Sequence, residues 1–305
     1  RATHGDRGTI FSFYQMVNLS ASTIGQLVMI IKPPSDFFFF ALGAIVYCLA
    51  ILPTALSTAT MPKPLKTARL DIRRLYANSP VSAFTAFMIG LVNGAFGTLG
   101  PVYANKIGLS VPEIAILMAA ALLGGSLMQF PLGWLSDRMD RRRGLAGAAV
   151  GALILGVTIT FLQPRNPTLV IGLVVIWGAM IYPMYSLVVA HANDFAGPDE
   201  FVKIAGGLLL LLGIGTVFGP IAAAFAMERF IPEGLFAFTA LVHALVIAYV
   251  LYRMTRRPPP DRVLRESFKG MPVAKTATPE SATLDPRSAE EIPIAEEVNP
   301  SSPRE

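Results

Sequence analysis

Residues 204–227 read IAGGLLLLLGIGTVFGPIAAAFAM, an uninterrupted run of 24 residues without a charged side chain. About 20 apolar residues in a helix cross the 30 Å hydrocarbon core of a bilayer. Seven further segments have the same character, roughly 9–31, 37–56, 80–103, 112–133, 144–162, 168–190 and 234–252. Their apolar residues are continuous rather than alternating, which favours helices over the strands of a membrane barrel. The sequence therefore predicts an all-α membrane protein with eight transmembrane helices.

The composition supports this interpretation. Of the 305 residues, 53% are hydrophobic and 15% are charged, whereas a soluble domain carries about 25% charged residues. The low charge argues against a soluble enzyme, a secreted disulfide scaffold and a nucleic-acid binder. Cys48 is the only cysteine, so an intrachain disulfide cannot form.

The loops indicate the direction of the chain through the membrane. Seventeen Lys and Arg residues fall in segments 1–8, 57–78, 134–143, 191–203 and 253–265, which lie on one side. The other side has four, Lys32, Lys106, Arg165 and Arg229. Because basic loops stay in the cytoplasm, we expect the first side to be cytoplasmic, with both chain ends there. The tail 254–305, with nine prolines and few large apolar residues, is expected to be disordered.

A weak internal repeat suggests how the spans are grouped. A shift of 194 residues places the first two spans on the last two, so that residues 21–26 fall on residues 215–220. Parallel repeats of six helices form the two halves of one large class of transporters. We therefore expect residues 1–56 to be the last two helices of a first half, 57–78 the linker, and 79–253 a complete second half. Four helices are then expected to precede Arg1 in the full protein.

A charged turn follows the fourth span. Residues 133–143 read GWLSDRMDRRR. Gly133 is expected to end the helix, and Asp137 can accept hydrogen bonds from the start of another helix or from an arginine. The arginines cannot cross lipid and hold the turn in the cytoplasm. A basic turn of this kind occurs in many membrane proteins, but this order of residues is more specific.

The turn resembles the signature Gly-x-Leu-Ala/Ser-Asp-Arg-x-Gly-Arg-Arg of the major facilitator superfamily. The matching residues are Gly133, Leu135, Asp137, Arg138, Arg141 and Arg142, and Asp140 stands where Gly is usual. The resemblance extends over about residues 1–255. It implies a helical bundle of two six-helix halves, with the eight spans as helices 5–12 of twelve. Gln129-Phe130-Pro131 and His191-Ala192-Asn193-Asp194 are similar to the YcaD-like bacterial branch.

Polar residues within the spans are candidates for contacts between the halves. Gln15, Asn18, Ser22 and Gln26 recur every three or four residues, which places them on one helix face. The resemblance places this helix opposite the one that carries Gln129. These side chains either exchange hydrogen bonds as the halves move or are static packing contacts.

The substrate cavity has four candidate residues. The resemblance implies that spans 80–103 and 168–190 line a central cavity, and these spans contain Asn93, Trp177, Tyr182 and Tyr185. Aromatic rings with polar tips beside a proline break at Pro183 suit an apolar or amphipathic substrate. The alternative is an aromatic belt at the membrane interface. His243, inside the last span, is either a proton relay or a packing histidine.

Asp137 suggests a latch. The resemblance places its turn against the cytoplasmic start of the first span, where Arg7 and Gly8 lie. An anion at a helix N-terminus gains about 0.3–2 kcal/mol. We expect this contact to close the cytoplasmic side.

The functional prediction is a secondary active transporter of a small molecule by alternating access. The resemblance alone implies proton coupling, a monomer in the lipid of a bacterial inner membrane, and no metal or other cofactor. The sequence contains no phosphate-binding Gly-x-x-x-x-Gly-Lys-Ser/Thr loop, so ATP is not expected to drive it. A non-transporting scaffold or receptor remains an alternative. An intramembrane enzyme is a weaker one, because His-Glu-x-x-His and paired acids within a span are absent.

Overall fold

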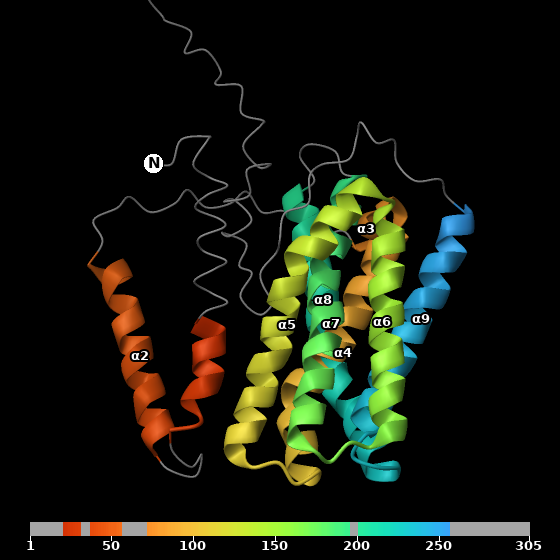
Figure 1. Cartoon of the computed structure of the whole chain (residues 1–305). Helices are drawn as coiled ribbons and strands as arrows, with labels where there is room; N and C mark the ends of the chain where they lie inside the picture. Colours follow the sequence, from red (N-terminus) through yellow and green to blue (C-terminus); the bar gives the residue numbers. More distant parts are fainter. Residues whose placement is uncertain (1–20, 32–36, 57–71, 196–200, 257–305) are drawn as a thin grey trace, which may run out of the picture.

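A computed structural model describes residues 21–31, 37–56, 72–195 and 201–256, and these residues form helices and short connections without strands. Residues 21–28 are helical. The further helices are α2 (Phe38–Ala55), α3 (Ile72–Asn78), α4 (Pro80–Lys106), α5 (Val111–Arg138), α6 (Arg141–Leu162), α7 (Pro167–Asn193), α8 (Phe201–Arg229) and α9 (Gly234–Arg256). Figure 1 shows α4–α9 as one bundle of roughly parallel and antiparallel helices.

Six of the helices, α4–α9, are long and apolar enough to cross a membrane. They correspond to the six spans expected for the second half. α2 is apolar but shorter, and the first expected span lies largely outside the described residues. The total of eight spans therefore stays a prediction. So does the disorder of the tail, because residues 257–305 are also outside the described part.

Short polar segments set the helix starts. Ser110 and Glu113 form a reciprocal capping box at the start of α5, in which the Ser110 N–H donates to Glu113 Oε2 at 2.7 Å. The Asn166 side chain caps α7 by accepting a hydrogen bond from the Leu169 N–H at 3.2 Å. Such side-chain acceptors satisfy N–H groups that have no partner within the helix. The helices can therefore follow one another through short connections.

Two helix ends differ from expectation. Gly133 does not end its helix, because α5 continues to Arg138. The helical hydrogen bonds continue beyond the apolar stretch, so hydropathy alone placed the end too early. Pro183 does not break its helix either, since α7 runs without interruption from Pro167 to Asn193. Neighbouring helices can compensate for the hydrogen bond that a proline removes within a membrane bundle.

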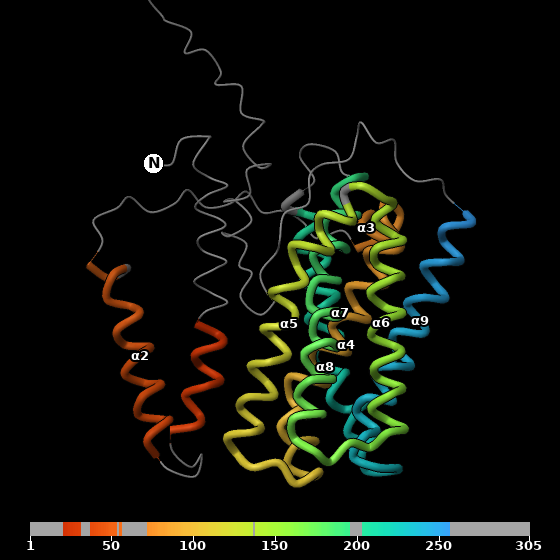
Figure 2. Tube along the Cα trace, viewed as in Figure 1, coloured from red at the N-terminus to blue at the C-terminus, as the bar shows by residue number. Residues whose placement is uncertain are grey.

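The bundle is built from two inverted sets of three helices. The most extensive contacts join α4 to α8 and α5 to α7, and α6 pairs with α9. The first set is α4, α5 and α6, and the second set is α7, α8 and α9. When the sets are matched in this order, α4 corresponds to α7 and α5 corresponds to α8. The contact of α4 with α8 then corresponds to the contact of α7 with α5. An odd number of spans reverses direction, so the second set is inverted relative to the first. The chain trace in Figure 2 follows both sets through the bundle.

Glycines allow the closest of these crossings. A Cβ on Gly90 would lie 2.2 Å from the Leu212 carbonyl oxygen of α8, and Gly94 meets the α8 backbone in the same way. From the other side, a Cβ on Gly215 would lie 2.2 Å from the Phe87 carbonyl oxygen of α4. Gly90 and Gly94 are four residues apart, so both face α8 at this crossing. Small residues at such crossings bring the helix backbones into contact.

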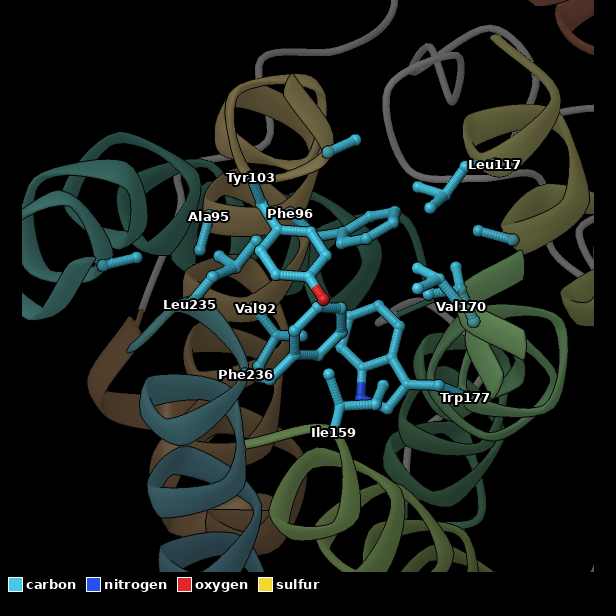
Figure 3. Packing of buried hydrophobic residues seen from close by; sticks show 14 of the residues in the cluster. Val92, Ala95, Phe96, Tyr103, Leu117, Ile159, Val170, Trp177, Leu235 and Phe236 are labelled. Atoms are coloured by element: carbon cyan, nitrogen blue, oxygen red, sulfur yellow. The ribbon is translucent and has the colours of Figure 1, made fainter. Parts of the chain in front are cut away.

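An aromatic cluster fills the interior towards the end of the bundle at which α9 begins (Figure 3). The ring centroids of Phe96 and Trp177 lie 4.8 Å apart, and those of Tyr103 and Phe236 lie 5.0 Å apart. All four side chains are buried. They come from α4, α7 and α9, so this cluster joins three helices by apolar packing.

Candidate functional site

The signature turn is compact. α5 ends at Arg138, α6 begins at Arg141, and only Met139 and Asp140 lie between the helices. Asp140 is the N-cap of α6, and its side chain accepts a hydrogen bond from the Arg142 N–H at 3.0 Å. Its backbone has φ −61° and ψ 122°, an extended conformation that needs no glycine. The replacement of the usual Gly by Asp therefore adds a cap without strain.

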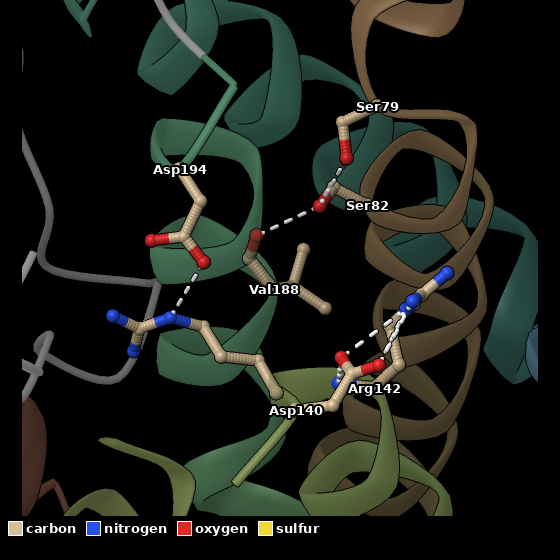
Figure 4. Close-up of polar contacts among 7 residues, drawn as sticks. Ser79, Ser82, Asp140, Arg142, Val188 and Asp194 are labelled. Atoms are coloured by element: carbon tan, nitrogen blue, oxygen red, sulfur yellow. Dashed lines mark hydrogen bonds and ion pairs between the residues drawn. The ribbon is translucent and has the colours of Figure 1, made fainter. Parts of the chain in front are cut away.

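Asp140 also pairs with the Arg142 side chain. Arg142 Nη2 lies 2.8 Å from Asp140 Oδ2, and both side chains are almost entirely buried. Burial raises the pKa of Asp140, but the hydrogen bonds and charge of Arg142 lower it more, so the net pKa lies below its usual value. Asp140 therefore stays ionised and fixes Arg142 at the start of α6 (Figure 4).

A second ion pair joins this turn to the end of α7. Arg141 Nε donates to Asp194 Oδ2 at 2.8 Å, and the two side chains are only 2% and 1% exposed. Asp194 directly follows α7, whose last turn contains the buried His191 and Asn193. The arginines of the turn were predicted to fix its side of the membrane, but this pairing was not predicted. The sequence held one signal for this pairing. Asp194 is an acidic residue at the end of a predicted span, on the same predicted side of the membrane as the basic turn.

The other matching residues of the turn form no ion pair with α7 among the described residues. Gly133 is buried and Leu135 is exposed on the last turns of α5. Arg138 is exposed, with its guanidinium 3.5 Å from the centroid of the Trp134 ring. Asp137 belongs to α5, but its side chain and all of Arg7 lie outside the described part. The latch between Asp137 and Arg7 therefore stays a prediction.

The four cavity candidates lie in two environments. Asn93 on α4 and Tyr182 on α7 are partly exposed, and among the described residues the Asn93 Oδ1 atom has no hydrogen-bond partner. Tyr185 is buried in the core between the helices, and Trp177 is fully buried in the aromatic cluster. The Asn93 Oδ1 atom itself is buried, so contact of Asn93 and Tyr182 with a ligand stays a prediction. A cavity role for Trp177 and Tyr185 likewise stays a prediction.

The structure describes only some of the residues predicted to make contacts between the halves. Gln129 on α5 donates to Ser186 Oγ on α7 at 3.1 Å, a contact within the six-helix bundle. Ser22 and Gln26 are partly buried on the helical residues 21–28, whereas Gln15 and Asn18 lie outside the described residues. A contact between these side chains and Gln129 therefore stays a prediction.

A buried acid at the opposite end was not predicted. Glu233, directly before α9, is fully buried and forms an ion pair with the half-exposed Arg165 from the α6–α7 connection. His243 lies deeper in α9, buried, with Nδ1 2.6 Å from the Thr239 carbonyl oxygen of its own helix. Within the described residues, no group of three or more His, Cys, Asp or Glu could hold a metal ion.

Comparisons with known proteins agree with this architecture. The family Major Facilitator Superfamily matches residues 82–293, more than half of the chain. The uncharacterized MFS-type transporter YfkF of Bacillus subtilis is 32% identical over 169 residues, which is 54% of this chain and 41% of YfkF.

Two longer matches extend over 85% of this chain and 67% of each relative. The uncharacterized MFS-type transporter Ent638_1421 of Enterobacter sp. is 28% identical. The uncharacterized MFS-type transporter YcaD of Shigella flexneri is 26% identical. The chain thus spans less than half of YfkF and about two thirds of the other two relatives. The family match and the six membrane-length helices together lead to one conclusion: this chain is a multi-pass membrane protein of the major facilitator superfamily.

Proposed function

We propose that the full protein is a secondary active transporter that moves a small apolar or amphipathic molecule across the bacterial inner membrane by alternating access, coupled to protons. The observation that carries this proposal is the inverted pairing of α4–α8 and α5–α7 in a chain whose family members transport small molecules. This construction is the one used by transporter halves that move against each other around a site near the midplane.

The outer face of α5 supports a moving contact with another helix. Leu123, Leu127, Phe130 and Trp134 recur along one side of α5 and are 50%, 67%, 80% and 53% exposed. Behind this face, Gln129 is bonded to α7, so α5 is held by the bundle on one side only. We assign the exposed face to the boundary with the first half, with residues 9–31 as the helix that covers it.

The latch belongs to the same proposal. The compact turn after α5, with Arg141 and Arg142 engaged by Asp194 and Asp140, gives Asp137 a rigid base. We propose that Asp137 contacts the helix start near Arg7 and closes the cytoplasmic side. Asp137→Asn is then expected to change the transport rate while the melting temperature stays that of the wild type. An unchanged rate and unchanged cytoplasmic accessibility would remove the latch from the proposal.

Transport itself is tested with the complete gene product in proteoliposomes. A panel of radiolabelled small molecules is offered with and without an imposed pH gradient. We expect saturable movement of at least one compound that accelerates with the gradient and is absent from empty liposomes. If the rate at which a compound moves is the same with and without the pH gradient, proton coupling is refuted. Tight binding without movement would instead favour a receptor or scaffold on the same fold.

A further inference from the structure

A groove runs between α6 and α9 near the end of the bundle where α9 begins. Four residues of each helix line it, from Leu153 to Phe161 on α6 and from Ala237 to Ala244 on α9. Its volume is about 320 Å³, which lies within the range of small-molecule binding sites. Both helices are long and apolar enough to cross a membrane, so the groove lies at the depth of the hydrocarbon core.

Small residues bring the two helices together at the groove. A Cβ on Gly156 of α6 would lie 3.2 Å from the Ala240 Cβ of α9, so the helices cross closely there. Ala240 is buried at this crossing, whereas Phe161 and Leu241 are 83% and 60% exposed. The groove therefore has a closely packed floor, with large exposed apolar side chains beside it.

The lining is almost entirely apolar. Of the eight lining residues, Thr160 alone is polar and none is charged. The Thr160 hydroxyl donates to the Gly156 carbonyl oxygen of its own helix at 2.7 Å, so this donor is already engaged. An ordered water molecule needs several polar partners, and the groove does not supply them. Its occupant is therefore a hydrocarbon group.

The length of the groove matches one leaflet of a bilayer. A helix rises about 12 Å from Leu153 to Phe161, and one leaflet contributes about 15 Å of hydrocarbon. α6 ends at Leu162, so the groove extends from one membrane surface towards the middle of the bilayer. A further transmembrane helix would need a seam along the whole core of about 30 Å. The length therefore favours a single hydrocarbon chain over a helix.

The position of the groove points to the bilayer as the source of this chain. Figure 1 shows α6 and α9 on the side of the bundle away from α2. Residues 257–305 continue from the opposite end of α9, which lies towards the other membrane surface. We propose that the groove binds one acyl chain of a membrane phospholipid, from the leaflet at the end where α9 begins.

Contact area gives the groove its preference for a chain. Lipid chains are as apolar as leucine side chains, so water exclusion does not drive binding within the membrane. A chain in the groove contacts α6, α9 and the floor between them, whereas a chain on a convex helix face contacts one helix. The additional carbon contacts add dispersion attraction. The bound chain thus packs against both helices and exchanges more slowly than the surrounding lipid.

The test uses the full chain in nanodiscs of phosphatidylcholine, a small share of which carries a photoreactive diazirine on its acyl chain. Light attaches the labelled chain to the side chains that it contacts, and mass spectrometry of peptides locates the adducts. We expect the adducts to concentrate on the groove residues of α6 and α9. Exposed apolar residues of the same helices outside the groove, Ile154, Leu245 and Leu251, are expected to carry fewer.

Ala237→Leu is the decisive variant. Ala237 lines the groove and is exposed, so a larger side chain there occupies the groove and leaves the packing behind it intact. The variant is expected to lower the adduct yield in the groove about fivefold, because the leucine replaces part of the chain and its contacts. The matched control Ala248→Leu adds the same atoms to the same helix, at an exposed position outside the groove. It is expected to change the yield less than about twofold, because the groove contacts remain.

Three results would overturn the proposal. The first is an even distribution of adducts over the exposed apolar residues of α6 and α9, which would indicate the ordinary lipid layer around the protein. The second is an equal yield in the groove for Ala237→Leu and Ala248→Leu. The third is a groove without lipid adducts in which α6 and α9 can be cross-linked to a second copy of the chain. None of these results bears on transport, which is measured separately with substrate.

Discussion

The crossing of α4 and α8 allows the effect of a single methyl group on stability to be worked out. A Cβ on Gly215 would lie 2.2 Å from the Phe87 carbonyl oxygen and 2.9 Å from the Gly90 Cα. Both neighbours are backbone atoms, so the two helices must separate. Overpacking of this kind costs up to about 3 kcal/mol, whereas alanine gains about 1 kcal/mol over glycine in a helix. Gly215→Ala should therefore lower the free energy of unfolding by about 2 kcal/mol.

The matched control lies two residues away on the same helix. A Cβ on Gly213 would meet nothing within 4 Å, so Gly213→Ala should leave stability unchanged or raise it by up to about 1 kcal/mol. The melting temperature in detergent, followed by tryptophan fluorescence, should fall by about 4–8 °C for Gly215→Ala. If Gly215→Ala melts at the same temperature as Gly213→Ala, the helices do not cross as closely as described and the reasoning fails.

Three further predictions concern the ion pairs and the aromatic cluster. Arg141→Ala removes the guanidinium that pairs with the buried Asp194 carboxylate and should lower stability by about 3–5 kcal/mol. Arg143→Ala, at an exposed position, should stay within about 0.5 kcal/mol of wild type, and thermal unfolding of both variants separates them. Trp177→Ala removes a fully buried ring and should lower the free energy of unfolding by about 3–5 kcal/mol. Trp134→Ala removes a half-exposed ring and should lower it much less. Similar melting temperatures of the two variants would contradict the packing of Trp177 in the aromatic cluster. The pKa of Asp140 is lowered in the folded protein, so the stability it provides is present above its unfolded pKa of about 4 and is lost as the pH falls through the lower folded value. The difference in melting temperature between wild type and Asp140→Asn should therefore shrink as the pH falls below about 4, and a constant difference down to the folded-state pKa would speak against the ion pair.

The helices of the bundle follow from the sequence because their apolar runs are long and uncharged. The Gly90-x-x-x-Gly94 spacing in the sequence coincides with a close crossing in the structure, since only small residues permit backbone contact in lipid. Two positions inside helices do not follow from the local sequence. Gly133 and Pro183 lie inside continuous helices, because their effect depends on neighbouring helices that the local sequence does not specify.

The polar contacts were the least predictable part. Both faces of a membrane helix are apolar, so hydropathy does not distinguish the buried face of α7 from the exposed one. The chemistry of Trp177 suits a cavity, and the sequence gives no sign that its ring packs against Phe96 and Phe236. The partners of Arg141 and Glu233 lie 53 and 68 residues away in the chain, and only the folded arrangement of the helices brings them together.

Alternating access is the central claim, and paired spin labels in the complete gene product test it most directly. In a background in which Cys48 and every other cysteine of the gene product are replaced by serine, one pair is placed at Phe37 and Lys106, on the predicted outer side. The other is placed at Leu56 and Arg143, on the predicted cytoplasmic side; all four positions are exposed. We predict that a change of pH or the addition of a transported compound shortens the distance in one pair while it lengthens the distance in the other. Distances that stay fixed, or that change in the same direction in both pairs, would contradict it.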